Sequence, residues 1–466
     1  SVLGVPVWAA LMVWLALWYA AVALIISVTR QTRAWGFAGV AAWMGLEWLC
    51  ARAPWGGFGW GRLAYTAPGT LIDGLFPIIS ATGVSLVIVV TGFALAWLVW
   101  PVVSGERPLT LRSLQRLPIG VVAGLLVISA GGGLLGRMYD PAPDGGEVTV
   151  AVVQGNVPGL GLDALGPRYS VEHNHLAETI ILAAQICTGQ VQTPDFVVWP
   201  ENSTATDPYT DRHTAQAIRL AVDLVGMPIL VGVITNGPGD DERQVTSLWW
   251  TPDQSVTATY SKRNLVPFGE WIPVREFFLD LIPDLAYVGR QSIPGTGPGV
   301  FDVTVDGRRL QVGFWICYEV AYDATVDDVF LPKDRPGAQV VVEQTSNAWA
   351  TGSDQIPHQQ KITQVRAMES RREILLATTN SHTGWIDSHG VVVYQSTMRA
   401  SDVQVFTVPL RSHITPAIAC RAGFDVASIL LPLLGCLGVA VLYFVRRGTR
   451  NRLEASPPEA ILDDAT

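Results

Sequence analysis

The chain carries two different patterns of hydrophobic and polar positions. Five stretches are apolar almost throughout, at residues 5–28, 35–50, 71–102, 117–135 and 424–445. Because a helix of about 20 residues crosses the hydrocarbon core of a bilayer, the pattern predicts that these stretches form transmembrane helices. The first four fall within residues 1–136 and the fifth within residues 413–446. The chain opens on Ser1 directly before the first stretch, so we expect that further spans precede it.

The basic residues indicate which ends of these helices face the cytoplasm. Arginines lie between the first and second stretches, between the third and fourth, and after the fifth, at Arg30, Arg33, Arg107, Arg112, Arg116, Arg446, Arg447, Arg450 and Arg452. The positive-inside rule makes these segments cytoplasmic. Counting spans then places residues 137–412 on the extracytoplasmic face of the cell membrane. The tail at 447–466 is rich in Pro, Ala and acidic residues, which predicts a disordered cytoplasmic segment.

The middle of the chain has the second pattern, in which short apolar runs alternate with amphipathic stretches. The runs predict strands at 147–154, 195–199, 228–234, 246–251, 310–316, 338–343, 374–379 and 384–387. Helical spacing appears between some of them, at 169–187, 214–225 and 356–372. Strands that alternate with helices favour a layered α/β domain with mixed sheets. The fold class predicted from the sequence is therefore a multi-span helical membrane domain joined to an α/β domain.

The composition narrows the classes of function. The formal net charge of −9 argues against a nucleic-acid-binding protein, because phosphate binding requires a basic surface. The five cysteines form no Cys-x-x-Cys pair and do not indicate a disulfide framework. His173 and His175 look like a pair of metal ligands, but positions i and i+2 of a helix point in different directions. We therefore expect no metal site and no cofactor.

Three residues of the middle domain have the chemistry of an acyl-transfer site. Cys317 ends an apolar run, where a following helix N-terminus favours a thiolate. Glu201 follows another run and could accept the thiol proton. Lys262 is one of only three lysines in the chain, and its ammonium could stabilise the thiolate and an oxyanion. Strand ends collect functional residues in such folds, so we expect the three side chains to meet.

The segments around these residues resemble a known family. Trp-Pro-Glu at 199–201, Leu-Val-Pro-Phe-Gly-Glu at 265–270 and Ile-Cys-Tyr-Glu at 316–319 are similar to the motifs of the carbon-nitrogen hydrolase (nitrilase) superfamily. The Pro-Phe-Gly-Glu form and the membrane-spanning flanks resemble its apolipoprotein N-acyltransferase branch. Further similar segments lie at 54–60, 153–158, 346–349 and 366–369.

This resemblance implies a fold and a reaction. The implied fold of residues 137–412 is an α-β-β-α sandwich. The implied mechanism has Glu201 as base, Lys262 as stabiliser and Cys317 as nucleophile, with Glu270, Tyr318, Glu319 and Trp349 lining the site. A phospholipid would donate its acyl chain to Cys317, and the N-terminal amine of a diacylglyceryl-cysteine on a lipoprotein would collect it, as a ping-pong reaction.

Two alternatives use the same sequence differently. A membrane-anchored amidase or nitrilase would employ the same triad with water as the acceptor, and only the apolar spans argue against it. A scaffold protein that partners a polyprenol-phosphate mannosyltransferase would need no triad. The intact Glu-Lys-Cys set favours an enzyme over the scaffold.

Overall fold

The computed structural model describes residues 4–32, 34–103, 119–159 and 166–454. These residues form two compact units. The first unit comprises Ser1–Cys50, Ser85–Ile128 and Ala422–Thr466, and the second comprises Ala51–Val84 and Ser129–Arg421. The loop at 51–84 therefore belongs to the same unit as the middle domain.

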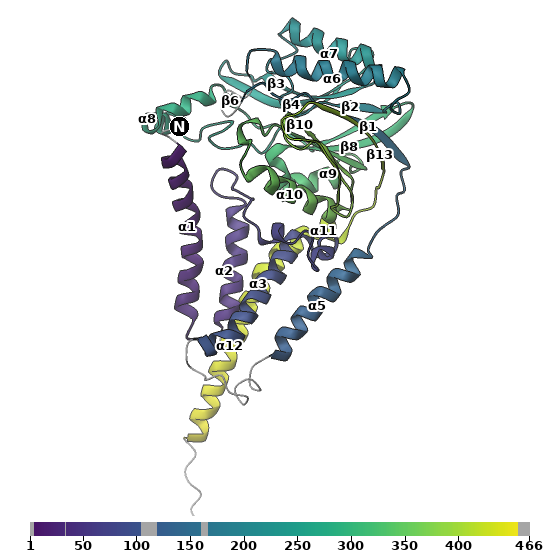
Figure 1. The fold of residues 1–466 in the computed structure, drawn as a ribbon. Coiled ribbons are helices and arrows are strands. Elements are labelled where there is room, and N and C mark those ends of the chain that lie inside the picture. The colour runs from purple at the N-terminus through teal and green to yellow at the C-terminus, as the bar shows by residue number, and fades with distance from the viewer. Residues whose placement is uncertain (1–3, 33, 104–118, 160–165, 455–466) are drawn as a thin grey trace, which may run out of the picture. The chain divides into compact units, whose positions relative to one another are not determined.

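Each of the five apolar stretches forms a helix (Figure 1). These helices are α1 (Gly4–Thr29), α2 (Trp35–Cys50), α3 (Phe76–Val103), α5 (Ile119–Arg137) and α12 (Arg421–Glu454). Three segments are long and apolar enough to cross a membrane, namely Leu11–Thr29, Asp73–Trp100 and Arg421–Val441. The helix α2, with 16 residues, and the apolar segment Val122–Arg137 are shorter. The predicted combination of an apolar helical domain with an α/β domain is confirmed.

Helix α12 is longer than the apolar pattern predicts. It continues to Glu454, into the segment from residue 447 for which the sequence predicts disorder. Arg, Leu and Glu in this last part are good helix formers, and the first prolines beyond the helix are Pro457 and Pro458. The rest of the predicted tail, 455–466, lies outside the described residues.

Small residues let the helices of the first unit approach closely. A Cβ atom on Gly39 of α2 would lie 2.3 Å from the ring of Phe93 of α3. A Cβ atom on Gly435 of α12 would lie 2.5 Å from the ring of Phe37 of α2. Glycine at such contacts is typical of helices that pack within a membrane.

The second unit contains a seven-stranded mixed sheet. Its order is β13-β1-β2-β3-β4-β5, and β6 pairs with β4. The strands are β1 (Glu147–Gln154), β2 (Phe196–Val198), β3 (Ile229–Asn236), β4 (Glu242–Trp250), β5 (Val256–Ser261), β6 (Gln291–Ser292) and β13 (Asp402–Pro409). The pairs β1-β2 and β2-β3 are parallel, and β13 joins β1 in antiparallel register from the far end of the domain.

A six-stranded sheet forms the other half, with the order β12-β11-β10-β9-β8-β7. Its strands are β7 (Val300–Val305), β8 (Arg308–Ile316), β9 (Val340–Thr345), β10 (Ile374–Thr378), β11 (Gly384–Ile386) and β12 (Val392–Gln395). The central strands β8, β9 and β10 are parallel. All six residues of β9 are buried, as expected for a central strand covered on both faces.

Alternate side chains of the strands build two hydrophobic layers. Val150 and Val152 of β1 join Phe314 and Val342 of the other sheet in the core between the sheets. Ala151, on the opposite face of β1, packs in a second core with side chains of α6 (Ser170–Cys187) and α7 (Arg212–Val225). Helix α10 (Gln355–Ser370) lies against the outer face of the six-stranded sheet, where it bonds to β9. The predicted α-β-β-α sandwich is confirmed (Figure 1).

A group of buried charges ties separate segments of this unit together. We call Arg62, Asp323, Arg366, Glu369 and Arg421 the arginine cluster. Arg62 Nη2 lies 2.5 Å from Asp323 Oδ2, and Arg366 Nη2 lies 2.9 Å from Asp323 Oδ1. Arg421 Nη1 lies 2.8 Å from Glu369 Oε1. The cluster connects the loop at 51–84, helix α10 and the start of α12.

Candidate active site

Glu201, Lys262 and Cys317 each follow the end of a strand. Glu201 lies just beyond β2, and Lys262 is the first residue after β5. Both strands belong to the seven-stranded sheet. Cys317 follows β8 of the six-stranded sheet and opens the short 3-10 helix η5 (Cys317–Ala321). The site therefore draws residues from both sheets.

Lys262 is held between two carboxylates. Its Nζ atom lies 3.0 Å from Oε1 of Glu201 and 2.8 Å from Oε1 of Glu270. The side chains of Lys262 and Glu201 are 1% and 3% exposed, so this contact is shielded from water. Burial alone would lower the pKa of Lys262, but the charges of Glu201 and Glu270 raise it well above its usual value. Lys262 is therefore a fixed positive charge in the site.

Glu201 is positioned by a backbone group from the other sheet. The N–H of Ser346, directly after β9, donates to Oε2 of Glu201 over 2.8 Å. Burial raises the pKa of Glu201 above its usual value, although Lys262 acts in the opposite direction. A carboxyl with a raised pKa is suited to accept and return a proton.

Cys317 has an unusual backbone conformation, with φ at 52°. A positive φ is uncommon for a residue with a Cβ atom, and such residues cluster at functional sites. The thiol is buried, and burial together with the charge of Glu201 raises its pKa, whereas Lys262 lowers it. These electrostatic interactions place the thiol within the field of the Glu201 and Lys262 side chains.

The structure differs from the sequence prediction on the charge of this thiol. The sequence favours a thiolate at a helix N-terminus, but η5 is a five-residue 3-10 helix. Its dipole is short, and burial beside the carboxylates outweighs it. Burial therefore favours the protonated thiol, in contrast to the thiolate that the sequence predicts.

Glu270 and Glu319 both support the loop that carries Lys262. Besides its contact with Lys262, Glu270 accepts a hydrogen bond from the N–H of Val266 over 2.7 Å. Glu319 Oε1 accepts from the N–H of Arg263 over 2.7 Å, and its Oε2 accepts from the N–H of Ile316 over 3.0 Å. Glu319 thus joins the segment after Lys262 to the residue before Cys317.

Tyr318 connects the cysteine turn to the loop at 51–84. Its hydroxyl donates to the carbonyl of Gly57 over 3.2 Å, and the hydroxyl of Tyr322 donates to the same carbonyl over 2.8 Å. The ring of Tyr318 stacks on Trp60 with the centroids 6.0 Å apart. Trp60 belongs to a segment that follows a predicted membrane span in the sequence, so this segment supplies an aromatic contact to the cysteine turn.

Trp349 is the predicted lining residue that the structure does not join to this group. It lies in the 3-10 helix η6 (Ala348–Ala350), and 56% of its side chain is exposed. Among the described residues, no hydrogen bond connects it to Glu201, Lys262 or Cys317.

Gln344 is a site-supporting residue that the sequence did not single out. Its Nε2 donates to the carbonyl of Trp199 over 2.6 Å, and its Oε1 accepts from the hydroxyl of Ser247 over 2.5 Å. Gln344 is fully buried at the end of β9, and it therefore holds the two sheets together beside Glu201. The available signal was a polar pair, Glu343-Gln344, at the end of a valine run.

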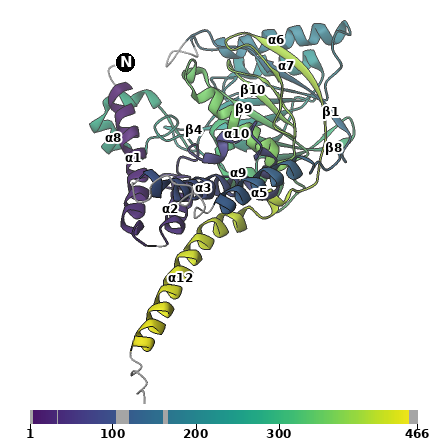
Figure 2. The same cartoon turned by 60° about the horizontal axis from the view of Figure 1, so that its bottom comes forward.

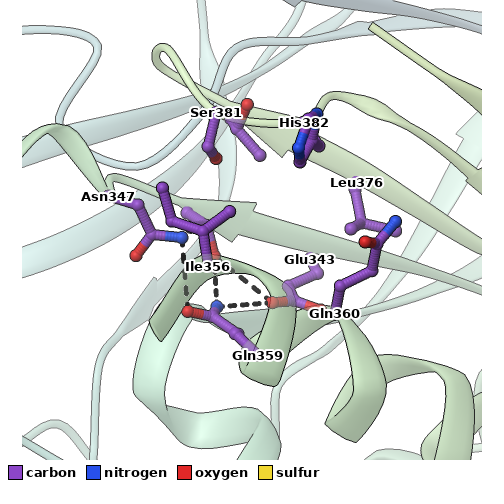
Figure 3. A pocket seen from close by; sticks show the side chains of 10 residues that line it. Glu343, Asn347, Ile356, Gln359, Gln360, Leu376, Ser381 and His382 are labelled. Carbon is purple, nitrogen blue, oxygen red and sulfur yellow. Dashed lines mark hydrogen bonds between the residues drawn. The ribbon is translucent and has the colours of Figure 1, made fainter. Parts of the chain in front are cut away.

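A small pocket lies on the other face of β9, against α10 (Figure 3). Its lining includes Glu343, Asn347, Gln359, Ser381 and His382. Glu343 accepts hydrogen bonds from Gln359 Nε2 over 2.7 Å and from the Thr363 hydroxyl over 2.5 Å. Burial raises the pKa of Glu343 to about 7. No cation pairs with Glu343 among the ion pairs of the described residues.

The possible metal ligands are elsewhere, on α6 and α7. Within the described part of the chain, one group of three such residues comes together: Glu172, His173 and His213. His175 points away from this group, since its Nδ1 bonds to the carbonyl of Val171 inside the core. His173 and His175 therefore lie apart, and His173 lies beside His213 instead.

Two helix-covered sheets thus carry a glutamate, a lysine and a cysteine near their strand ends. The family model of the carbon-nitrogen hydrolases matches residues 149–413, and the chain belongs to this family. The model of the apolipoprotein N-acyltransferase N-terminal domain matches residues 1–94. The likeness to this branch, predicted from the sequence motifs, is confirmed.

Relatives with this name are similar over most of the chain. The apolipoprotein N-acyltransferase of Mycolicibacterium smegmatis is 31% identical over 77% of this chain, and that of Nitrosomonas europaea is 28% identical over 91%. The chain spans 59% of the length of the first protein and 79% of the second. Among solved structures, an amidase from Nesterenkonia sp. matches with 16% identity and a TM-score of 0.41, over 57% of this chain and 92% of that chain.

Proposed function

We propose that this protein transfers an acyl chain from a phospholipid, through a thioester on Cys317, to the N-terminal amine of a diacylglyceryl-cysteine on a lipoprotein. The observation that carries the proposal is the buried Lys262, held 3.0 Å from Glu201 and 2.8 Å from Glu270 in the electrostatic surroundings of Cys317. The names of the relatives supply the class of acceptor.

The first half of the reaction forms the thioester. Cys317 Sγ attacks the ester carbonyl of the phospholipid while Glu201 accepts the thiol proton, because the resting thiol has a raised pKa. Lys262 stabilises the tetrahedral oxyanion with its fixed charge. The C–O ester bond then breaks, and Glu201 returns the proton to the departing lysophospholipid oxygen.

The second half delivers the acyl group to an amine. The α-amine of the acceptor attacks the thioester carbonyl, and Glu201 accepts a proton from the nitrogen. The C–S bond breaks, an amide forms, and the proton passes to the Cys317 sulfur. The enzyme therefore returns to its starting state without a cofactor.

Both substrates of this reaction are lipids, and the chain has features suited to them. Three of its helices are long and apolar enough to span a membrane. The arginine-rich segments support a cell-membrane protein whose hydrolase domain is extracytoplasmic. Outward-facing lipoproteins and the outer leaflet would then be within reach of Cys317.

A lid over the site is part of this proposal. Helix α8 (Arg275–Leu281) and the residue before it carry large apolar side chains that face solvent, with Val274, Phe277 and Leu281 exposed by 67%, 59% and 65%. Phe278 packs edge-on against Trp55 and Phe268, which connects this segment to the loop at 51–84. Exposed apolar surface of this kind fits contact with acyl chains.

The test is mass spectrometry of the full chain purified in detergent micelles. Incubation with phospholipid should add one acyl mass to the peptide that contains Cys317, hydroxylamine should release it, and Cys317→Ala should prevent it. Absence of this adduct on the intact protein would contradict the proposal.

The same preparation separates the alternatives. A diacylglyceryl peptide with a free α-amine should collect the acyl group, and the same peptide with a blocked amine should not. Release of free fatty acid or ammonia as the main product would instead support an amidase that uses water. Partnership with a polyprenol-phosphate mannosyltransferase stays a prediction, which co-purification from native membranes can examine.

A further inference from the structure

Two histidine rings face each other at the N-terminal ends of neighbouring helices. His173 lies in the first turn of α6, and His213 lies in the first turn of α7. Their Nε2 atoms are 3.4 Å apart, and both side chains are exposed. The two helices run side by side over the outer face of the seven-stranded sheet (Figures 1 and 2).

Glu172 determines which nitrogen of His213 carries the proton. Its Oε1 atom lies 2.8 Å from Nδ1 of His213, and its Oε2 accepts from the hydroxyl of Thr214 over 2.9 Å. Glu172 is fully buried. An ionised carboxylate only accepts hydrogen bonds, so Nδ1 of His213 carries the proton and Nε2 presents its lone pair toward His173. Carboxylates orient metal-binding histidines in this way.

Other contacts fix the His213 ring in place. The Tyr169 ring lies 4.2 Å from it, centroid to centroid. Asp211 caps α7 by accepting from the N–H of His213 over 3.0 Å, and it also accepts from the Tyr169 hydroxyl over 2.9 Å. The position of the ring is therefore set by the protein before any ligand arrives.

The separation of the two nitrogens matches a shared metal ion. Zinc binds imidazole nitrogen at about 2.0–2.1 Å in tetrahedral geometry, which places two such nitrogens roughly 3.3–3.4 Å apart. A hydrogen bond between the rings would more commonly be about 2.7–3.2 Å long. The observed 3.4 Å lies at the metal-bridged value.

We propose that His173 and His213 bind one zinc ion through their Nε2 atoms, with Glu172 orienting His213 from behind. Two nitrogen ligands suit zinc and similar transition metals, whereas Mg²⁺ and Ca²⁺ prefer oxygen. The two remaining coordination positions face solvent, because both rings are exposed. Water, or a donor group from a bound molecule, completes the coordination. This site shares no residue with the Glu201, Lys262 and Cys317 group.

The experiment measures metal binding directly. Full-length protein in detergent micelles, freed of its affinity tag and stripped with a chelator, is titrated with Zn²⁺, and bound zinc is counted by mass spectrometry. We expect one zinc per chain, lost in His173→Ala and in His213→Ala. Glu172→Gln should weaken binding by about 10- to 100-fold, as loss of a carboxylate behind a histidine ligand does. Cobalt in place of zinc should give visible absorption bands.

The controls separate this site from nonspecific binding and from misfolding. His389→Asn changes a partly exposed histidine near Asp140 and should bind zinc as the wild type does. Thioester formation on Cys317 should be unchanged in His173→Ala, which shows that the variant is folded. Zinc binding that survives His173→Ala, or a wild-type protein that retains no zinc at micromolar concentration, would overturn the proposal whatever the outcome for acyl transfer.

Discussion

The second unit contains two groups of buried charges that differ in the ratio of cations to carboxylates. In the first group, the ammonium of Lys262 pairs with the carboxylates of Glu201 and Glu270, and burial raises the pKa of Glu201. In the arginine cluster, three guanidinium groups surround Asp323 and Glu369. Burial would raise the pKa of Asp323, but the arginines hold it well below its usual value.

The different numbers of cations and carboxylates indicate which of the two groups is suited to proton transfer. Asp323 contacts three arginines, which lower its pKa and so favour its ionised form, and it acts as a structural connector. Burial raises the pKa of Glu201, which suits that carboxyl to exchange a proton. The two groups are close in sequence at Cys317 and Asp323, and Arg366 Nε donates to the carbonyl of Val320 between them. The arginine cluster thus supports the turn that carries Cys317.

The largest expected effect is on the rate of thioester formation when Glu201 is replaced. Glu201→Gln keeps the shape of the side chain but removes the base, so thioester formation should fall by roughly 10²- to 10⁴-fold. The folded state should persist, because Lys262 keeps its contact with Glu270. Mass spectrometry of the Cys317 peptide and a thermal melt measure the two effects. A large fall in melting temperature with little change in rate would reverse the assignment.

The arginine cluster should respond in the opposite way. Asp323→Asn removes the carboxylate charge that Arg62, Arg366 and Arg421 share, which should reduce the free energy of unfolding by roughly 3–5 kcal/mol. Denaturant unfolding in micelles measures the loss.

Arg309→Ala is the matched control for that variant. Arg309 pairs with Asp302, but its own side chain is 70% exposed. Removing an exposed ion pair should change stability by about 0–1 kcal/mol. Equal losses in the two variants would show that burial does not distinguish the cluster.

Glu343 adds a third case, a buried carboxyl that forms no ion pair within the described part of the chain. Its pKa of about 7 in the folded protein exceeds the usual 4.5, so the folded state binds more protons than the unfolded state between these values. The free energy of unfolding should therefore fall as the pH rises from about 4.5 to about 7, by at most about 3.4 kcal/mol. Glu343→Gln should flatten this pH dependence of the melting temperature. An unchanged slope would assign the pH dependence to other groups.

The sequence predicted the central strands well, because they depend on local patterns, and the catalytic roles of Glu201, Lys262 and Cys317 stay a prediction. The valine alternation at 147–154 matches β1 in full, and the apolar run before Cys317 matches the end of β8. The strand β5 was missed because its side chains are mostly half-exposed, as on the outside of a sheet. The strand β13 was also missed, because it is defined by its pairing with β1, which lies more than half the domain away in sequence.

The contacts around the site depend on long-range packing, which no local pattern carries. From the sequence, Gln344 is a polar residue at the end of a strand. Its hydrogen bonds to Trp199 and Ser247 form only because the two sheets pack together. The pKa of Cys317 was predicted from its position before a helix, but it is determined by burial and by charges from distant segments. The pairing of His173 with His213 likewise requires α6 and α7 to lie together.

The reactive centre lies across the seam between two sheets. Glu201 and Lys262 follow strands of one sheet, and Cys317 follows a strand of the other. Gln344 and Ser346 form hydrogen bonds between the two sheets. A sideways slip of one sheet over the other would separate Glu201 from Cys317 without unfolding either sheet. The turnover rate should therefore depend strongly on how the two sheets are aligned. Phe314 and Val342 lie in the core between the sheets, so a conservative substitution at either position should lower the turnover rate more than it lowers the melting temperature.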